Sequence, residues 1–230
     1  MTPDLFPDSS PLDMLILEAQ AARRGYLRVA GVDEAGRGPL AGPVVAAAVI
    51  LPDGLILPDV DDSKKLSAQV REELFDMISR EAIGVGVGIG DHHLVDRINI
   101  LQATLSAMRD AVLSLDPAPD FLLIDGISCI PMNIPQRTMK KGDSLSLSIA
   151  AASIIAKVTR DRIMREYDAI YPGYGFANHK GYGAASHLAA IARLGPSPIH
   201  RKSFRGVKEH LPVEPLAELS GSRSGFLPFL

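Results

Sequence analysis

Four acidic residues stand where the chain is expected to end a strand or to begin a turn. Asp33 and Glu34 close one apolar run, Asp125 closes another at residues 121–124, and Asp143 follows two lysines and a glycine. Ionised carboxylates that leave water need a cation as a partner. Carboxylate oxygens favour Mg²⁺ or Mn²⁺, whereas zinc sites are usually built from Cys and His. The four acids therefore predict a divalent-cation site.

Two of these acids are neighbours in the sequence, although successive side chains of a flat strand face opposite ways. The strand must therefore twist or end at Asp33, or one acid of the pair acts indirectly, for example through its backbone carbonyl. Arg37 is an alternative to a metal ion as the cationic partner of these acids. Asp33 and Glu34, considered without the other two acids, could also form an acidic turn that is simply exposed to water. Gly36 and Gly38 favour a functional loop, because a backbone without side chains lets a ligand approach closely.

The elements that must position these acids follow from hydrophobic periodicity and from turn residues. We expect helices over residues 11–25, 67–82, 92–98, 99–115, 144–170 and 183–194, and strands over 29–34, 44–51, 83–90, 121–124 and 136–139. An aromatic and glycine-rich loop is expected at 173–183. This order predicts an α/β sandwich built on a central mixed five-stranded sheet flanked by helices, with a helical C-terminal region.

Length and composition indicate one sizeable core, since the chain has 230 residues of which 47% are hydrophobic. We expect an N-terminal extension with a helix at 1–26, a catalytic domain at 27–210 and a flexible tail at 211–230. No apolar run approaches the roughly 20 residues of a membrane helix. The single cysteine, Cys129, is expected to be a buried, inert thiol and fits a cytoplasmic protein. Nothing requires more than a monomer.

Charge is distributed unevenly along the chain. The net charge is −3, yet residues 137–208 contain thirteen Lys and Arg against four Asp and Glu. Such asymmetry predicts a surface for a polyanion such as a nucleic acid. The alternative is an ordinary solvated basic helix face.

Separated motifs, all in one order, resemble the signature of the ribonuclease HII family, the type 2 ribonucleases H, in its bacterial form. They are residues 31–43 (GVDEAGRGPLAGP), 62–66 (DSKKL), 99–104 (NILQAT), 141–143 (KGD), 149–157 (IAAASIIAK) and 179–183 (HKGYG). The resemblance covers about residues 29–205 and implies a ribonuclease H-like fold.

The resemblance also implies an activity. Mg²⁺ or Mn²⁺, two ions per site with substrate, would be held by four catalytic acids: Asp33, Glu34, Asp125 and Asp143. The implied reaction cleaves the RNA strand of RNA/DNA hybrids, and DNA at embedded ribonucleotides, leaving a 5′-phosphate and a 3′-hydroxyl. Its implied roles are ribonucleotide removal from DNA and removal of RNA primers.

Substrate contacts follow from the same resemblance. Backbone groups of Gly36, Arg37 and Gly38 are expected to read the ribose 2′-hydroxyl, which distinguishes RNA from DNA. Tyr182 is expected to stack on a sugar, and the expected phosphate contacts are Lys64, Lys65 and Lys157. The alternatives are that Tyr182 is a half-buried loop residue without a role in binding, and that Lys64, Lys65 and Lys157 are ordinary exposed lysines.

Three other functions remain open at this point. The sister type, ribonuclease HIII, carries Gly-Lys-Gly where this chain has Gly36, Arg37 and Gly38, and it has a longer N-terminal extension. A junction resolvase of the same fold would lack the ribose-reading residues. A nucleic-acid-binding module without activity would not need four acids at strand ends.

The last residues suggest a partner. Residues 220–230 (SGSRSGFLPFL) place two Phe and two Leu after a polar stretch, a pattern suited to docking in a partner's groove. A replication sliding clamp is one candidate, although the glutamine that usually opens a clamp-binding motif is missing. The alternative, which we favour on the sequence alone, is that these apolar residues fold back on the enzyme.

Overall fold

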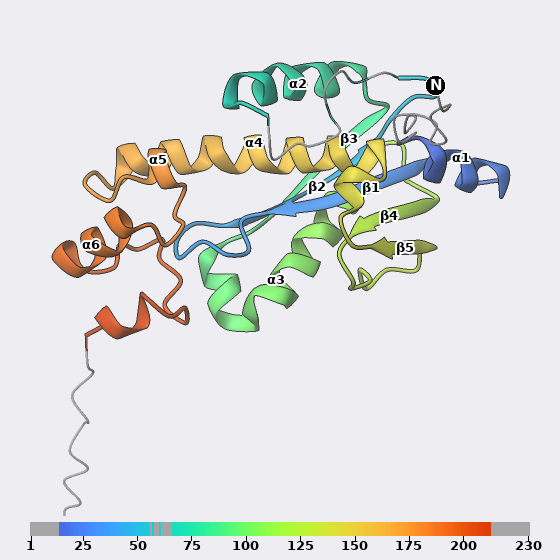
Figure 1. Ribbon diagram of the computed structural model, residues 1–230. Coiled ribbons are helices and arrows are strands. Elements are labelled where there is room, and N and C mark those ends of the chain that lie inside the picture. Colours follow the sequence, from blue (N-terminus) through green and yellow to red (C-terminus); the bar gives the residue numbers. More distant parts are fainter. Residues whose placement is uncertain (1–13, 56, 58–59, 61–65, 213–230) are drawn as a thin grey trace, which may run out of the picture.

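In a computed structural model of the chain, residues 14–55, 57, 60 and 66–212 are described. They include a five-stranded sheet in the order β3-β2-β1-β4-β5, with helices on both faces (Figure 1). The strands are β1 (Val29–Ala35), β2 (Val44–Ile50), β3 (Gly84–Gly90), β4 (Phe121–Asp125) and β5 (Gln136–Met139). The helices are α1 (Ile16–Arg23), α2 (Ala68–Glu81), α3 (His92–Leu113), α4 (Leu147–Ile170), α5 (Phe176–His179) and α6 (Ala185–Leu194), with the 3₁₀ turns η2 (Gly142–Ser144) and η3 (Lys208–His210).

The sheet is mixed, as predicted. Strand β1 pairs antiparallel with β2 and parallel with β4, and β4 pairs parallel with β5. The register of the parallel pair sets Val32 opposite Ile124. Since parallel strands end at the same edge of a sheet, Asp33 and Asp125, one residue further on, are brought to one edge.

The two faces of the sheet are covered by different helices. All seven residues of β2 are buried, and they alternate between two clusters. Ala46 and Ala48 belong to the cluster that contains α3, whereas Ala47 and Val49 belong to the cluster of α2 and α4. Figure 1 shows α3 on one side of the sheet and α4, with α2 above it, on the other.

Helix α3 packs directly on the backbone of β3. A methyl group added at Gly86 would lie 2.0 Å from the carbonyl oxygen of Ala111, and one at Gly88 would lie 2.0 Å from that of Ala107. The alternation of Gly with Ile and Val in β3 therefore serves a close helix–strand contact.

Capping residues fix several helix boundaries. Ser67 caps α2 as predicted, since its Oγ accepts a hydrogen bond from the N–H of Val70 at 3.2 Å. The expected break between two helices at 92–98 and 99–115 is confirmed as a kink inside α3, where Asn99 has φ 69°. Asn99 Oδ1 accepts from the N–H of Gln102 at 3.1 Å and so caps the second part.

Other boundaries differ from the expectation. Helix α4 begins at Leu147 rather than 144, because the turn η2 precedes it and Ser146 is its N-cap. Helix α1 spans only Ile16–Arg23. The expected loop at 173–183 contains the short helix α5. Cys129 is exposed, so the predicted buried thiol is wrong.

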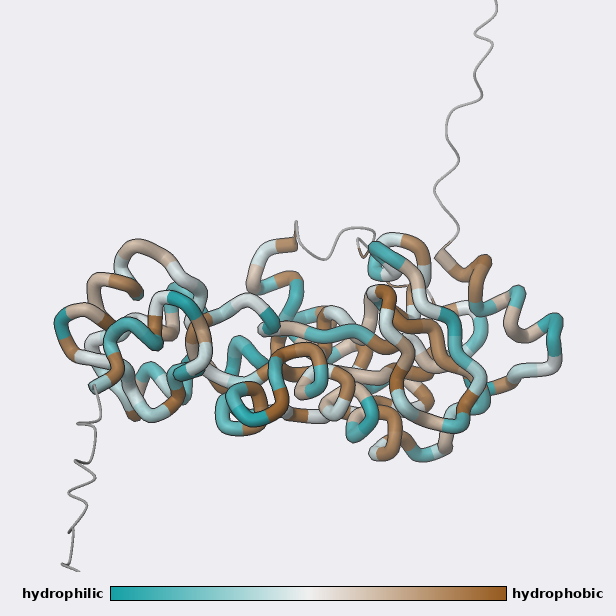
Figure 2. The backbone as a smooth tube through the Cα atoms, turned by 90° about the horizontal axis from the view of Figure 1, so that it is seen from below, coloured by the Kyte–Doolittle hydropathy of each residue, from teal (hydrophilic) through white to brown (hydrophobic). Residues whose placement is uncertain are grey.

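The residues after α4 form a helical region at the end of α4 that lies away from α1 (Figure 1). The hydrophobic colours in Figure 2 run mainly through the sheet-bearing part, and this C-terminal region appears as a separate cluster of loops beside it. It is held by two small apolar clusters, one around Met164 and Phe176 and one around Leu40 and Ile191. In the part of the chain that the structure describes, no helix is long and apolar enough to cross a membrane.

Candidate functional site

A groove of about 520 Å³ opens at the sheet edge where β1 and β4 end. Three of the four predicted acids line it, namely Asp33, Glu34 and Asp125. The other lining residues are Ala35, Gly36, Arg37, Gly38, Arg71, Ser153, Ile154, Lys157 and Tyr182. The groove therefore brings together residues from β1, α2, β4, α4 and the C-terminal region.

Asp33 is 5% exposed, and its Oδ1 accepts a hydrogen bond from the backbone N–H of Glu34 at 2.7 Å. Burial raises the pKa of Asp33 well above its usual value, and the charges of Glu34 and Asp125 raise it further. A hydrogen bond from Ser153 opposes this rise in pKa without cancelling it. A nearby cation would favour the ionised form of this carboxyl.

Glu34 also faces the groove, although it is the sequence neighbour of Asp33. Its Oε1 forms an ion pair with Arg37 Nη1 at 3.2 Å. Burial raises the pKa of Glu34, and Arg37 partly offsets this rise. Arg37 is thus a partner of the acidic pair, one of the two alternatives that the sequence left open.

Asp125 and Asp143 are linked by the turn η2. Asp125 Oδ1 accepts a hydrogen bond from the N–H of Gly142 at 2.7 Å, and Asp143 is the next residue. Asp143 is 7% exposed and is not among the residues that line the groove. The structure therefore brings three acids to the groove and holds the fourth on an adjoining turn.

The donor chemistry of these acids fits a divalent cation. The groove offers carboxylate oxygens, which are the ligands that Mg²⁺ and Mn²⁺ prefer. Burial raises the pKa of both Asp33 and Glu34, as expected for carboxyls whose ionised forms lack a sufficient cationic partner. Within residues 14–55, 57, 60 and 66–212, however, no three His, Cys, Asp or Glu side chains are gathered closely enough to hold a metal ion.

The loop between β1 and β2 is shaped by two buried arginines. Arg201 donates four hydrogen bonds of 2.6–3.0 Å, to the carbonyl oxygens of Gly36, Arg37, Pro39 and Gly42. Arg160 donates to the carbonyls of Ala41, Pro43 and Lys180 at 2.9–3.1 Å. A methyl group on Gly36, which has φ 94°, would lie 2.0 Å from Arg160 Nε. The loop conformation thus depends on glycine and on these two side chains.

The burial of the same arginines reduces the basic surface predicted for residues 137–208. Arg160 and Arg201 are 1% and 0% exposed, so neither can contribute to an exposed basic surface. Burial lowers the pKa of Arg201 to about 9 and that of Arg160 to about 10, which leaves both protonated at neutral pH. Part of the positive charge in residues 137–208 therefore stabilises the fold.

Tyr182 lies at the groove, beside the glycine loop. It is 47% exposed and lines the groove. Its Cε1 would be 3.7 Å from a methyl group added at Gly38, so its ring lies against the glycine loop. The backbone also joins the two loops, because the N–H of Leu40 donates to the carbonyl of Gly181 at 2.8 Å.

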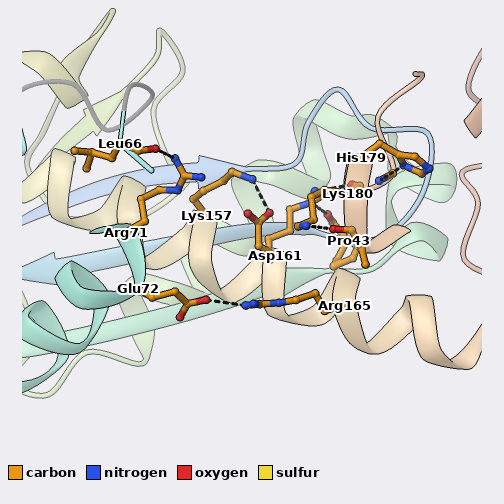
Figure 3. A network of polar contacts seen from close by, with 12 residues as sticks. Pro43, Leu66, Arg71, Glu72, Lys157, Asp161, Arg165, His179 and Lys180 are labelled. Atoms are coloured by element: carbon orange, nitrogen blue, oxygen red, sulfur yellow. Dashed lines mark hydrogen bonds and ion pairs between the residues drawn. The ribbon is translucent and has the colours of Figure 1, made fainter. Parts of the chain in front are cut away.

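Two basic side chains also line the groove. Lys157 lines it and pairs with Asp161 at 2.5 Å, as Figure 3 shows. Arg71 lines it too and donates to the carbonyl of Leu66 at 2.5 Å (Figure 3). Lys64 and Lys65 lie outside the described residues.

Two polar groove residues, Ser153 and Arg71, were not singled out from the sequence. Ser153 precedes Lys157 by four positions on α4, so the helical repeat alone places them on one face. Arg71 carried no comparable signal, because an arginine in an amphipathic helix usually faces solvent. Its place in the groove depends on how α2 packs on α4.

The chain is similar in sequence to known proteins of one family. The family model described as Ribonuclease HII matches residues 30–207. A curated protein named Ribonuclease HII, from Geobacter sp. (strain M21), is 75% identical over 227 residues, which cover 98% of this chain and 99% of that protein.

Two solved structures are similar at 26% sequence identity. The ribonuclease H2 from Pyrococcus horikoshii OT3 has a TM-score of 0.67, with 80% of this chain and 96% of that chain covered. The PCNA:RNase HII complex from Archaeoglobus fulgidus has a TM-score of 0.65, with 83% and 98% covered.

Proposed function

Because this chain belongs to the ribonuclease HII family, and is thereby an endonuclease that cleaves RNA in RNA/DNA hybrids, we propose that the groove at the end of β1 is its active site. The observation that carries the proposal is the convergence of Asp33, Glu34 and Asp125 beside the glycine loop and Tyr182. We include Asp143 in the catalytic set, since the η2 turn is hydrogen-bonded to Asp125.

The four acids would hold Mg²⁺ or Mn²⁺, and we propose two ions per site with substrate. Bound cations of this kind stabilise charge on phosphoryl oxygens and lower the pKa of water. Within the described residues no three acids lie close enough together to hold an ion, so the acids would move toward one another to do so. Ser153 would keep Asp33 oriented.

The glycine loop and Tyr182 would select the ribonucleotide. The Arg201 guanidinium donates to the loop carbonyls, which turns those carbonyls toward the protein interior. The N–H groups of Gly36, Arg37 and Gly38 can then donate hydrogen bonds to the ribose 2′-hydroxyl, while the Tyr182 ring stacks on a sugar. Lys157 and Arg71 would contact phosphates, as would Lys64 and Lys65. The products would be a 5′-phosphate and a 3′-hydroxyl.

The experiment compares three duplexes: DNA with one ribonucleotide, all-DNA, and a full RNA/DNA hybrid. The proposal expects Mg²⁺- or Mn²⁺-dependent nicking of the first and third and none of the second. Tyr182→Ala should lose about ten- to a hundredfold in rate on the single ribonucleotide, since a stacking aromatic contributes roughly 1–3 kcal/mol. Equal rates for the variant and the parent would show that Tyr182 does not take part in recognising the ribonucleotide.

The proposal extends to the setting of the enzyme. It would act in the cytoplasm as a monomer, on RNA/DNA hybrids and on DNA that contains ribonucleotides. A sliding-clamp contact through residues 220–230 is supported by the named complex of the archaeal relative with PCNA. Those residues lie outside the part of the chain that the structure describes.

A further inference from the structure

Behind the groove, the backbone of Tyr182 is joined to a buried pair of histidines. The carbonyl oxygen of Tyr182 lies 2.8 Å from His187 Nδ1, and His187 Nε2 lies 3.0 Å from His200 Nε2. The backbone N–H of Ser197 donates to His200 Nδ1 at 2.8 Å. Both imidazole rings are fully buried.

These contacts are compatible with one pair of neutral tautomers. A carbonyl oxygen only accepts hydrogen bonds, so His187 must carry its proton on Nδ1 and leave Nε2 as an acceptor. His200 Nδ1 accepts from Ser197, so the proton of His200 must be on Nε2. The two requirements agree, because His200 Nε2–H then donates to His187 Nε2.

The opposite tautomer of His200 is disfavoured by the same geometry. With its proton on Nδ1, His200 could donate to the Ser197 Oγ at 2.8 Å or to the Ser197 carbonyl at 3.3 Å. It would then face the Ser197 N–H with an N–H, and two nitrogen lone pairs would meet 3.0 Å apart at His187. Ser197 and His200 therefore fix the tautomer of His187, and this tautomer binds the Tyr182 carbonyl.

We propose that His200 is a positioning residue that acts through His187 to hold the backbone of Tyr182, so that the Tyr182 ring stays against the Gly38 loop. The role in cleavage rests on the function proposed above for Tyr182. The neighbouring Arg201 holds the carbonyls of the glycine loop, so two consecutive residues anchor the two loops that face each other in the groove.

Two substitutions separate the hydrogen bond from ring packing. His200→Gln keeps an N–H donor near the position of Nε2, whereas His200→Phe keeps the ring but has no donor. We expect His200→Phe to reduce kcat/KM on DNA with one ribonucleotide about tenfold, the effect of roughly one lost hydrogen bond. His200→Gln should recover most of this loss. Ile191→Val, a buried change on the nearby helix α6, is the control and should leave the rate unchanged.

The relay, by which we mean the hydrogen bonds from Ser197 through His200 and His187 to Tyr182, can be tested without an activity measurement. Nitrogen-15 NMR of the imidazole rings at pH 7 reports which ring nitrogens carry protons. The inference expects His187 protonated on Nδ1 and His200 protonated on Nε2 in the parent protein. In His200→Phe, the His187 proton should no longer be confined to Nδ1. Finding His187 protonated on Nε2 in the parent would overturn the inference.

A double-mutant cycle with Tyr182→Ala links the relay to cleavage. If His200 acts through Tyr182, His200→Phe should cost little more once Tyr182 is Ala. Full additivity, or a normal rate for His200→Phe alongside a slow Tyr182→Ala, would overturn the inference and leave the proposed function standing. A normal rate for Tyr182→Ala would instead refute the proposed role of Tyr182, and the NMR result would still decide the relay.

Discussion

The acidic residues of the groove are placed at a cost to the fold. Asp33 is nearly buried, and the charges of Glu34 and Asp125 act on it in addition to desolvation. Each of these influences disfavours its ionised form. Burial of this carboxyl does not serve stability when it is ionised, which agrees with its proposed place among cation-binding residues.

The unfavourable burial of Asp33 predicts how the stability of the protein changes with pH. The pKa of Asp33 is raised in the folded state, so the folded protein holds this proton more tightly than the unfolded chain. Stability should therefore fall as the pH rises from the unfolded pKa through the folded one, and the full loss is present above the folded pKa. Asp33→Asn removes the charge, so it should melt at a higher temperature than the parent at pH 7 in EDTA.

Mg²⁺ supplies the complementary test of the same residue. It should raise the melting temperature of the parent more than that of Asp33→Asn, because a ligand stabilises the state that binds it. A variant that melts earlier than the parent in EDTA at pH 7 would show that the Asp33 carboxylate stabilises the fold.

At the scale of elements, α1 anchors the start of α4. Glu18 Oε1 accepts hydrogen bonds from Ser146 Oγ at 2.6 Å, from Ser148 Oγ at 2.7 Å and from the Ser148 N–H at 3.0 Å. A carboxylate at a helix N-terminus also interacts favourably with the helix dipole. The N-terminal helix is thus tied to the helix that carries Ser153 and Lys157.

Glu18→Ala should lower the free energy of unfolding by about 1.5–3 kcal/mol, the range for hydrogen bonds to a charged group. Urea denaturation followed by circular dichroism measures this. Gln20→Ala, an exposed position of the same helix, is the matched control and should change little. Equal stability of Glu18→Ala and the parent would mean that α1 does not support α4.

The elements themselves could largely be predicted from the sequence, because local residues determine them. Ser67 and Asn99 each cap a helix by accepting a hydrogen bond from the N–H three residues later. The glycines of β3 indicate that another element packs closely on this strand. The four residues of α5 are too few to show a helical period. The burial of Arg160 and Arg201 could not be predicted, since their acceptors lie more than a hundred residues earlier for all but one contact.

At the scale of the molecule, the groove exists only when distant parts of the chain meet. Its lining runs from Asp33 in β1 to Tyr182 after α5, and includes Arg71 from α2. Glu72 on α2 also pairs with Arg162 and Arg165 of α4, which joins two helices of the groove wall (Figure 3). We therefore propose that residues 27–210 act as one catalytic domain, to which residues 1–26 are an extension.

The C-terminal residues give a prediction at this scale. Deletion of residues 220–230 should leave the melting temperature and the nicking rate of the isolated enzyme unchanged, while binding to the sliding clamp of the same organism is lost. Titration calorimetry of both forms with the clamp measures this. An earlier melt of the shortened protein, with no clamp binding by either form, would show that these residues cover the enzyme's own surface.

The central claim is that the carboxylates at the ends of β1 and β4 perform the cleavage, and Asp125→Asn tests it most directly. Asn keeps an acceptor for the Gly142 N–H but removes one charge from the set. The rate of nicking a DNA duplex with one ribonucleotide in Mg²⁺ should fall by about a thousandfold or more, since bound metal supplies several kcal/mol. Duplex affinity measured in EDTA and the melting temperature should stay close to those of the parent, and Asp110→Asn on the exposed face of α3 should cleave normally. Near-parental nicking by Asp125→Asn would contradict the account.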